Sequence, residues 1–502
     1  MNVLVVVVDA LRADRVRTLG GCNDLTPTID AFAEDATTFT NAYSTINTTD
    51  PAVTSIQTGC YPLSHGVVNH GWRVADEEKQ SVEAVPQLPE VLSDAGYRTG
   101  KFGRPLGRWH RHGFDRYPDQ MESRVAFDEQ SQPLTDRIGE LLDVVHPAVK
   151  NAGGALYSTV DSVLPKQDPS PEPYAHWEDR SKDHVVQNLA SWIDREEPFF
   201  SFVHLMDTHG PYTAPPELVK VYLEEFDYDV DRTEYEGWEV PSAFHAEVMN
   251  GEHPKIRDKY YFSKTPSTAV INASYDASVT VADKRFEYIL DTLVQQELVE
   301  DTIVILLADH GESLTEHGIY YDHHGLYDVT THIPLFINIP GKSGGTVEEF
   351  VQITDIAPTI TATLDVEGLK PDGRSLLPAI TQGATLDREF VLAEEAHTQR
   401  RRMIRTKSEK VIHLVDGDTI CRYCDIEHAP DTELYDLETD PEESNNLDRA
   451  RPADVADLRT KGEDAAEQFV AKRPAGDPDA GEKIVYEDEE EVYDRLEALG
   501  YR

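Results

Sequence analysis

The chain alternates between short apolar runs and longer stretches of mixed character. Four of the runs are almost uninterrupted, which predicts strands buried on both faces of a parallel sheet. They lie at Asn2–Val8, Phe199–Leu205, Ile303–Leu307 and Ile333–Ile339. The stretches between them predict helices, which lie from Thr26 onwards and over Leu88–Gly96, His184–Asp194 and Thr268–Val299. Buried strands that alternate with helices indicate an α/β fold.

Side chains that bind metals stand where three of these strands end. Asp9 follows the first strand, and Asp309 and His310 follow the third. The second strand ends in a similar group, namely His204, Asp207 and His209. Ligands of open α/β sheets bind beyond the carboxyl ends of the strands, so we expect these side chains at one edge. Taken alone, Asp9 is also consistent with an aspartate that caps a following helix at LRADRV.

A pair of threonines precedes another predicted helix. Thr48 and Thr49 are followed by Asp50-Pro51, and the helix is expected over Ala52–Gln57. A hydroxyl at a helix N-terminus lies among free backbone N–H groups at the positive end of the helix dipole. That position stabilises an alkoxide nucleophile or a bound oxyanion. By itself, however, the pattern favours a plain N-cap.

The last part of the chain has a different pattern. Between Asp387 and Leu447, short segments separated by turns predict antiparallel strands, and the tail EDEEEVYDRLEALGYR predicts an acidic amphipathic helix. We therefore expect a main α/β domain over residues 1–386 and a small subdomain over 387–502. Irregular excursions from the main domain are expected at about 118–190 and 211–262.

Four cysteines do not make a disulfide framework in a chain of this length. Cys421 and Cys424 form a lone C-x-x-C motif in the expected subdomain. The motif favours free buried thiols. The alternative is a small metal site that also uses His413 or His428.

Charge narrows the range of partners. Of 502 residues, 93 are acidic and 46 are basic, and the net charge of −47 is spread along the chain. This balance predicts a salt-requiring protein from an extreme halophile, and it disfavours nucleic acid and anionic membranes as partners. The first apolar run, Val3–Val8, is six residues long, too short for a secretion signal or a membrane span. We therefore expect a cytoplasmic protein.

One segment departs from the acidic character of the chain. KFGRPLGRWHRHGFDRY carries four arginines, Arg104 among them, and two histidines. Such a cluster can bind the anionic part of a substrate. A loop whose arginines pair with surface acids explains it equally well.

The strand-end residues and the threonines together describe a metal site. Two aspartates, one histidine and a hydroxyl suit Zn²⁺ or Mn²⁺, and less well Ca²⁺ or Mg²⁺. The ligands would be Asp9, Asp309, His310 and a threonine. The ion would lower the pKa of the threonine and polarise the oxygen under attack. A second ion held by Asp207, His209 and His324 is an open alternative.

Taken in order, the motifs resemble those of the sulfatase family within the alkaline phosphatase superfamily. The resemblance covers most of the chain and rests on the segments VVVVDALRADRV, TPTIDAFAEDATTFTNAYS, TTDPAVTSIQTGCYPLSHGV, FFSFVHLMDTHGPY, ADHGESLTEHG, HGLYDVTTHIPLFI, TDIAPTI, DGRSLLP and ELYDLETDPEESNNL. It implies an alkaline-phosphatase-like three-layer α/β/α sandwich with a small C-terminal antiparallel subdomain. It also implies a hydrolase of phosphate or sulfate esters that holds at least one divalent metal ion.

The chain departs from the sulfatase pattern at the nucleophile. Thr49 stands where sulfatases carry the Cys or Ser that becomes formylglycine, and Val53 replaces an Arg of the family. A threonine cannot form that aldehyde because its β-carbon bears a methyl group. Ala10 replaces the second Asp of an Asp-Asp pair, and Arg104 and His324 fall near two substrate-binding lysines. The remaining set resembles relatives whose threonine attacks phosphorus.

These observations predict a metal-dependent hydrolase of phosphate mono- or diesters. Its substrate would be a small molecule, a glycan or a lipid headgroup. The metal ligands would be Asp9, Thr49, Asp309 and His310, the catalytic residues Thr49, His209 and His324, and the substrate-binding residues Arg104 and His204. The alternatives are a true sulfatase that uses Thr49 directly and a binding protein that keeps the fold without turnover. The pattern leaves the oligomeric state open.

Overall fold

A computed structural model describes residues 1–118, Trp177, 179–226 and 268–474, apart from 107, 195, 211, 213, 315, 320 and 423–426. The excursions expected at about 118–190 and 211–262 lie for the most part outside these residues. The acidic tail helix and Cys424 also lie outside them. The predictions for these segments therefore stay predictions.

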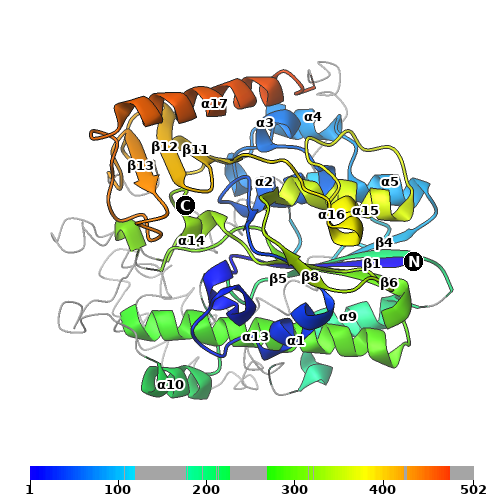
Figure 1. Ribbon diagram of the computed structural model, residues 1–502. Helices are drawn as coiled ribbons and strands as arrows, with labels where there is room; N and C mark the ends of the chain where they lie inside the picture. The colour runs from blue at the N-terminus through cyan, green and yellow to red at the C-terminus, as the bar shows by residue number, and fades with distance from the viewer. Residues whose placement is uncertain are drawn as a thin grey trace, which may run out of the picture.

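The centre of the molecule is a mixed sheet of seven strands (Figure 1). In spatial order they are β4 (Arg98–Gly103), β5 (Phe199–Leu205), β1 (Asn2–Val8), β6 (Thr302–Ala308), β7 (Leu335–Asn338), β2 (Thr37–Phe39) and β8 (Gly345–Val347). From β4 to β6 the neighbours run parallel, whereas β7 is antiparallel to β6 and to β2. A small separate ladder pairs β3 (Ala42–Tyr43) with β9 (Val351–Gln352).

Strand β1 is the central strand of the parallel part. Residues 3–8 are fully buried, because β5 and β6 pair with its two edges and helices cover its two faces. A continuous valine-rich run suits a strand that meets water on neither face. The register pairs Val8 with both Leu205 and Ala308, so the residues that follow these three strands leave the sheet at one level. The parallel pairing expected for the runs at Asn2–Val8, Phe199–Leu205 and Ile303–Leu307 is confirmed. The fourth run, Ile333–Ile339, forms the buried strand β7, but this strand is antiparallel to both of its neighbours.

Helices cover both faces of the sheet, which produces the three expected layers (Figure 1). One layer contains α1 (Pro27–Asp35), α9 (His184–Trp192) and α13 (Thr268–Gln295), with α10 (Pro216–Glu225) packed on α13. The other contains α2 (Thr49–Thr58), α5 (Leu88–Asp94), α15 (Ile356–Leu364) and α16 (Leu377–Gln382), extended by α3 (Pro62–His65) and α4 (Asp76–Glu83). No helix in the described ranges combines the length and apolarity needed to cross a membrane.

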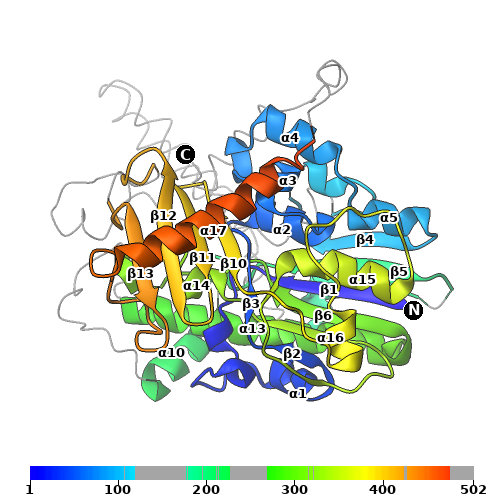
Figure 2. The ribbon, with the colours of Figure 1, turned by 45° about the horizontal axis from the view of Figure 1, so that its top comes forward.

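A second sheet, antiparallel and four-stranded, lies beside the first (Figure 2). Its strands are β10 (Val391–Glu395), β11 (Arg400–Arg405), β12 (Glu409–Asp416) and β13 (Thr432–Asp436), and α17 (Pro452–Val470) packs across β11 and β12. An apolar cluster that includes Tyr43, Tyr327, Met403 and Tyr435 joins this sheet to the main part of the fold. The expected antiparallel strands are confirmed, and the domain boundary at 386–387 stays a prediction.

Three local expectations differ from the structure. Two short 3-10 turns, and no α-helix, follow β1 at Ala13–Arg15 and Arg17–Leu19. The stretch 36–43, ATTFTNAY, alternates in a way that predicts one strand, but it forms β2 and β3, which belong to different sheets. Helix α2 begins at Thr49, three residues earlier than expected. Pro51 does not prevent this start, because backbone N–H groups in the first turn of a helix have no partner inside the helix.

A buried cation fastens the C-terminal sheet to the main part of the fold. Lys410, on β12, is fully buried and contacts the carboxylates of Asp328 and Glu443. Arg405 pairs with the same Asp328 at 3.2 Å. Asp328 begins α14 (Asp328–Thr331), which follows β6 along the chain, so this ion group joins the two sheets.

We expect Lys410→Met to lower the free energy of unfolding by about 3–5 kcal/mol, because the two buried carboxylates then lose their compensating charge. Denaturant unfolding of the purified protein measures the change. Lys407→Met is the matched control, since Lys407 is exposed on the turn before the same strand and should change stability by less than about 0.5 kcal/mol. Equal unfolding midpoints for the two variants would contradict the role given to Lys410.

Candidate active site

Two aspartates lie side by side where the central strands end. Asp9 follows β1, Asp309 follows β6, and both are fully buried. Because Val8 pairs with Ala308, the next residues of both strands emerge together. The two carboxylates and the imidazole of His310 offer ligand atoms that all lie within 4.8 Å of one another. The structure therefore brings together the three side chains that the strand ends led us to expect in one place.

Each carboxylate has one oxygen engaged and one oxygen left over. Asp309 Oδ1 accepts hydrogen bonds from two backbone N–H groups at 3.2 and 3.0 Å. Asp9 Oδ2 faces His204 Nε2 at 3.0 Å and the Thr49 hydroxyl at 3.4 Å. Asp9 Oδ1 and Asp309 Oδ2 are buried and accept no hydrogen bond from the described residues. Buried, unpaired carboxylate oxygens are costly, so this arrangement calls for a cation.

The main chain orients the imidazole of His310. Its Nδ1 lies 2.8 Å from Gly311 O, which makes Nδ1 the donor and leaves the lone pair on Nε2. Gly311 has no room for a side chain, because a Cβ there would lie 2.1 Å from Val329 O in α14. The free nitrogen, Nε2, faces the Thr49 hydroxyl at 3.2 Å. The imidazole thus presents an acceptor nitrogen to the carboxylate group.

Thr49 reaches this group from a helix on one face of the sheet. It is the first residue of α2 and is buried, and Thr48 occupies the N-cap position. The Thr48 side chain makes no cap hydrogen bond, so a plain capping role does not explain the pair. The N-terminus of α2 adds a partial positive charge at the Thr49 hydroxyl, where negative charge would develop.

The four side chains fit a divalent cation. Two carboxylates, an imidazole nitrogen and a hydroxyl suit Zn²⁺ or Mn²⁺ best among common ions. The fit rests on the two unpaired oxygens of Asp9 and Asp309, which show the atoms that would face the ion. Burial raises the pKa of Asp309, and the charge of Asp9 adds to that rise. Burial also acts on Asp9, but His209, His204 and His310 outweigh it and hold the pKa of Asp9 well below its usual value.

Three further predicted residues border this group. His204, on β5, is fully buried and its Nε2 faces Asp9, so it orients that carboxylate, and the expected contact of His204 with substrate stays a prediction. His209 lies half-buried at the same edge, where burial lowers its pKa to about 4. Arg104 follows β4, and its charge adds to the lowering of the His209 pKa, which places the two groups close together.

The loop after β6 separates two neighbouring histidines. The His323 ring lies 4.7 Å from the ring of His310 and 6.3 Å from that of His209. His324 Nδ1 lies instead 3.9 Å from Sγ of Cys421 in the C-terminal subdomain. Successive side chains of a non-helical segment point in opposite directions, so only one of the two faces the aspartates. The structure places His323 where His324 was expected.

The second metal site predicted from Asp207, His209 and His324 is not assembled. Asp207 accepts two hydrogen bonds from Arg285 Nη1, at 3.1 and 3.0 Å. Arg285 belongs to α13 and also pairs with Asp183 at 2.6 Å. The predicted ligand set is wrong because a helix far along the chain supplies a competing cation for Asp207.

Two polar groups near the site were not predicted. Lys101, on β4, is fully buried, and its ammonium makes no hydrogen bond with the described residues. Burial lowers the pKa of Lys101 to about 7. The negative charges of nearby acids oppose that change, and Asp50 contributes most. Asp50 lies between His70 and His110, at 2.9 and 3.4 Å. Two features of the sequence could have indicated these groups. One is a lysine within a buried strand, and the other is an acid directly after Thr49.

Comparison with known families matches both parts of the chain. The family model described as Sulfatase matches residues 1–366, and the model of the C-terminal region of N-sulphoglucosamine sulphohydrolase matches residues 315–464. The uncharacterized sulfatase YidJ of Escherichia coli (strain K12) is 25% identical over 488 residues, which cover 94% of this chain and 87% of that protein. Human N-acetylglucosamine-6-sulfatase is 26% identical over 416 residues, which cover 77% of this chain and 66% of that protein.

The fold has matching relatives among solved structures. The phosphonate monoester hydrolase of Agrobacterium radiobacter superposes with a TM-score of 0.64 at 20% identity, covering 94% of this chain and 96% of that chain. This likeness confirms the alkaline-phosphatase-like fold. The Sulfatase match extends over Asp9, Thr49, Asp309 and His310. The chain therefore belongs to the sulfatase family, whose members are ester hydrolases.

Proposed function

We propose that the protein is a metal-dependent hydrolase that cleaves a phosphate ester with Thr49 as its nucleophile. The observation that carries the proposal is the position of the Thr49 hydroxyl, 3.4 Å from the Asp9 carboxylate and 3.2 Å from His310 Nε2. A threonine side chain cannot become an aldehyde, so the hydroxyl itself has to attack. The phosphonate monoester hydrolase among the structural relatives agrees with attack on phosphorus.

A divalent cation bound by Asp9, Asp309 and His310 would supply the positive charge that lowers the pKa of the threonine hydroxyl. Thr49 Oγ1 forms a bond to phosphorus as the bond to the leaving ester oxygen breaks. The hydroxyl proton has Asp9 Oδ2 as its nearest carboxylate acceptor. Water then cleaves the phosphothreonine ester and restores Thr49. This step releases phosphate when the substrate is a monoester and a phosphate monoester when it is a diester. His204 keeps Asp9 in place throughout.

His209, His323 and Arg104 form the side of the proposed substrate site that would meet the anionic ester. Burial lowers the pKa of both histidines, so both imidazoles are neutral at pH 7 before substrate binds. An anionic ester beside them raises these pKa values again, because an opposite charge favours the protonated ring. One imidazolium can then protonate the leaving oxygen while Arg104 pairs with a non-bridging oxygen.

A sulfate ester is the second candidate substrate. The family match and the human N-acetylglucosamine-6-sulfatase favour it, and they make a glycan ester a reasonable form for it. Against it stands Val53, which provides no charge at a position where formylglycine sulfatases carry an arginine. The phosphate ester is therefore our preferred substrate, as a small molecule, glycan or lipid headgroup. The net charge of −47 supports assays at high salt.

Thr49→Ala is expected to lower turnover of an aryl phosphate or aryl phosphodiester by about 10⁴-fold or more, since the nucleophile is gone. Initial rates on aryl phosphate, aryl phosphodiester and aryl sulfate measure this. Thr49→Ser keeps a hydroxyl and should retain part of the activity. Thr48→Ala is the matched control and should stay near wild type. Unchanged turnover in Thr49→Ala would refute the mechanism, and turnover of the sulfate alone would reverse the preference for phosphorus.

Asp309→Asn is expected to reduce bound divalent metal and activity together, because a neutral amide replaces an anionic ligand. Metal analysis of the purified protein measures occupancy. Glu312→Gln is the matched control. Glu312 is a buried acid nearby that is not one of the proposed ligands, and burial raises its pKa well above its usual value, which favours the protonated form that an amide resembles. A wild-type protein without bound metal or turnover would favour a binding protein that merely keeps the fold.

A further inference from the structure

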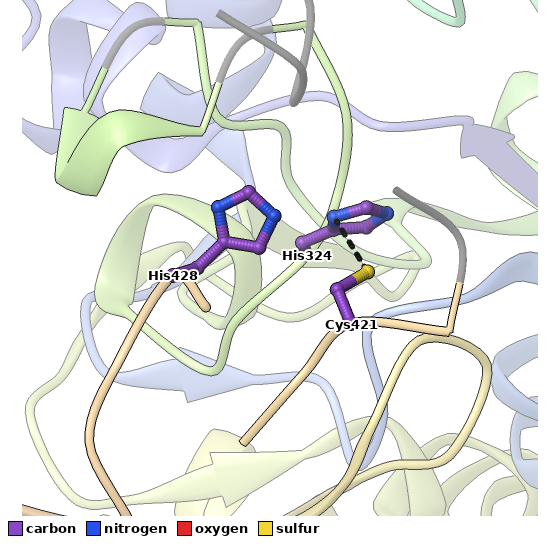
Figure 3. A group of neighbouring side chains, drawn as sticks. All are labelled: His324, Cys421 and His428. Atoms are coloured by element: carbon purple, nitrogen blue, oxygen red, sulfur yellow. Dashed lines mark hydrogen bonds between the residues drawn. The ribbon is translucent and has the colours of Figure 1, made fainter. Parts of the chain in front are cut away.

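A second group of metal-ligand side chains lies away from the proposed active site. His324, Cys421 and His428 offer ligand atoms that all lie within 4.8 Å of one another. Figure 3 shows His324 meeting Cys421 and His428, which both come from the C-terminal part of the chain. Cys421 and His324 are buried, and His428 is half-buried. A cysteine and two histidines form a softer donor set than the aspartates around Thr49, and this set suits Zn²⁺.

The spacing of the group agrees with a shared ion. Zn–S and Zn–N bonds of about 2.3 and 2.0 Å at a tetrahedral angle put sulfur and nitrogen roughly 3.5 Å apart. His324 Nδ1 lies 3.9 Å from Cys421 Sγ, and the rings of His324 and His428 lie 5.7 Å apart. A small adjustment of side chains would close these distances around one ion. A pocket lined by both histidines adjoins the group.

Asp322 lies on the side of the His324 imidazole that faces away from Cys421. Its Oδ2 lies 3.4 Å from His324 Nε2, the nitrogen that does not face the sulfur. Histidines that bind metals commonly donate their other N–H to a carboxylate, which fixes the tautomer and strengthens the ligand. The chain therefore provides an outer partner for His324 as well as a ligand set.

The group also joins two distant parts of the fold. His324 belongs to the loop after β6, whereas Cys421 and His428 belong to the connection between β12 and β13. His323, the neighbour of His324, lies beside His310. An ion held here would therefore fix both the C-terminal subdomain and the loop that carries His323.

We propose that His324, Cys421 and His428 bind a structural zinc ion that holds the C-terminal subdomain against the active-site loop. The thiol of Cys421 loses its proton to solvent when the ion binds, and both imidazoles bind as neutral ligands. Of the two histidines named with the C-x-x-C motif, His428 belongs to the group. His413 instead faces Glu463 at 3.6 Å. Cys424 lies outside the described residues, and the proposal stands on the three described ligands.

Cobalt substitution tests the site without reference to catalysis. The full-length Asp309→Ala variant, stripped by a chelator and reloaded with Co²⁺, should show a thiolate-to-cobalt charge-transfer band. The active-site ligands contain no sulfur and cannot produce that band. Adding Cys421→Ser should remove it, and zinc should then no longer raise the melting temperature. Cys60→Ser is the matched control, since Cys60 is a buried free thiol elsewhere in the fold and its loss should leave the band intact.

A second variant covers the case in which Cys421→Ser fails to fold. His428→Gln changes a half-buried loop residue and should weaken zinc binding by roughly tenfold or more. Loss of a residue that only hydrogen-bonds to a ligand already has an effect of about this size, and the loss of a ligand should have at least as large an effect. Absence of the band in the Asp309→Ala protein would overturn the proposal. So would a band that survives Cys421→Ser, or zinc affinity unchanged by His428→Gln. Because every arm can be read in a protein without turnover, failure here is distinct from failure of the proposed function.

Discussion

The structure depends on the parallel register of β1 with its two neighbours. That register places Asp9 and Asp309 next to each other in a fully buried position. Two carboxylates in such a place repel each other and lose their hydration, so the arrangement is stable only with nearby positive charge. His204 and His310 contact the Asp9 carboxylate, and the partial positive charge at the N-terminus of α2 lies near it. A divalent cation would supply positive charge most directly.

The nucleophile follows from the same constraint. Thr49 comes from α2, which covers the sheet just above the end of β1, and its hydroxyl meets Asp9 and His310 within 3.4 Å. Gly311 packs closely against the backbone of α14, and this packing positions the neighbouring His310. Charge, helix dipole and steric fit therefore converge on one oxygen atom. This convergence separates Thr49 from Thr48, its neighbour of identical chemistry.

The C-terminal subdomain takes part in the site through the loop after β6. Apolar packing around Tyr327 and Met403 and the ion group of Lys410 hold the second sheet against that loop. His324 extends the same connection toward Cys421. The position of His323 beside His310 thus depends on a sheet that begins 68 residues further along the chain, at 391–436.

The sequence by itself determined the strands, the residues at their ends and the antiparallel character of the C-terminal part. Continuous apolar runs have few alternatives to a buried strand, although they do not set its direction, since β7 is antiparallel to its neighbours. The residues that follow parallel strands collect at one edge. From these rules Asp9, Asp309 and His310 could be predicted, and the motif spacing added Thr49. Periodicity did not reveal that β2 and β3 belong to different sheets, because their pairing partners lie far along the chain, in β7, β8 and β9.

Only the tertiary structure decided which of several similar side chains face the site. His323 and His324 are adjacent and chemically identical, and the direction of each depends on packing against β10–β13. Asp207 has the chemistry of a metal ligand, but in the structure it accepts hydrogen bonds from Arg285 of α13. Lys101, which the sequence did not single out, lies buried near the acids of the site. The contacts of Asp207 with Arg285 and of His324 with Cys421 join residues 78 and 97 positions apart in sequence, which local patterns do not encode.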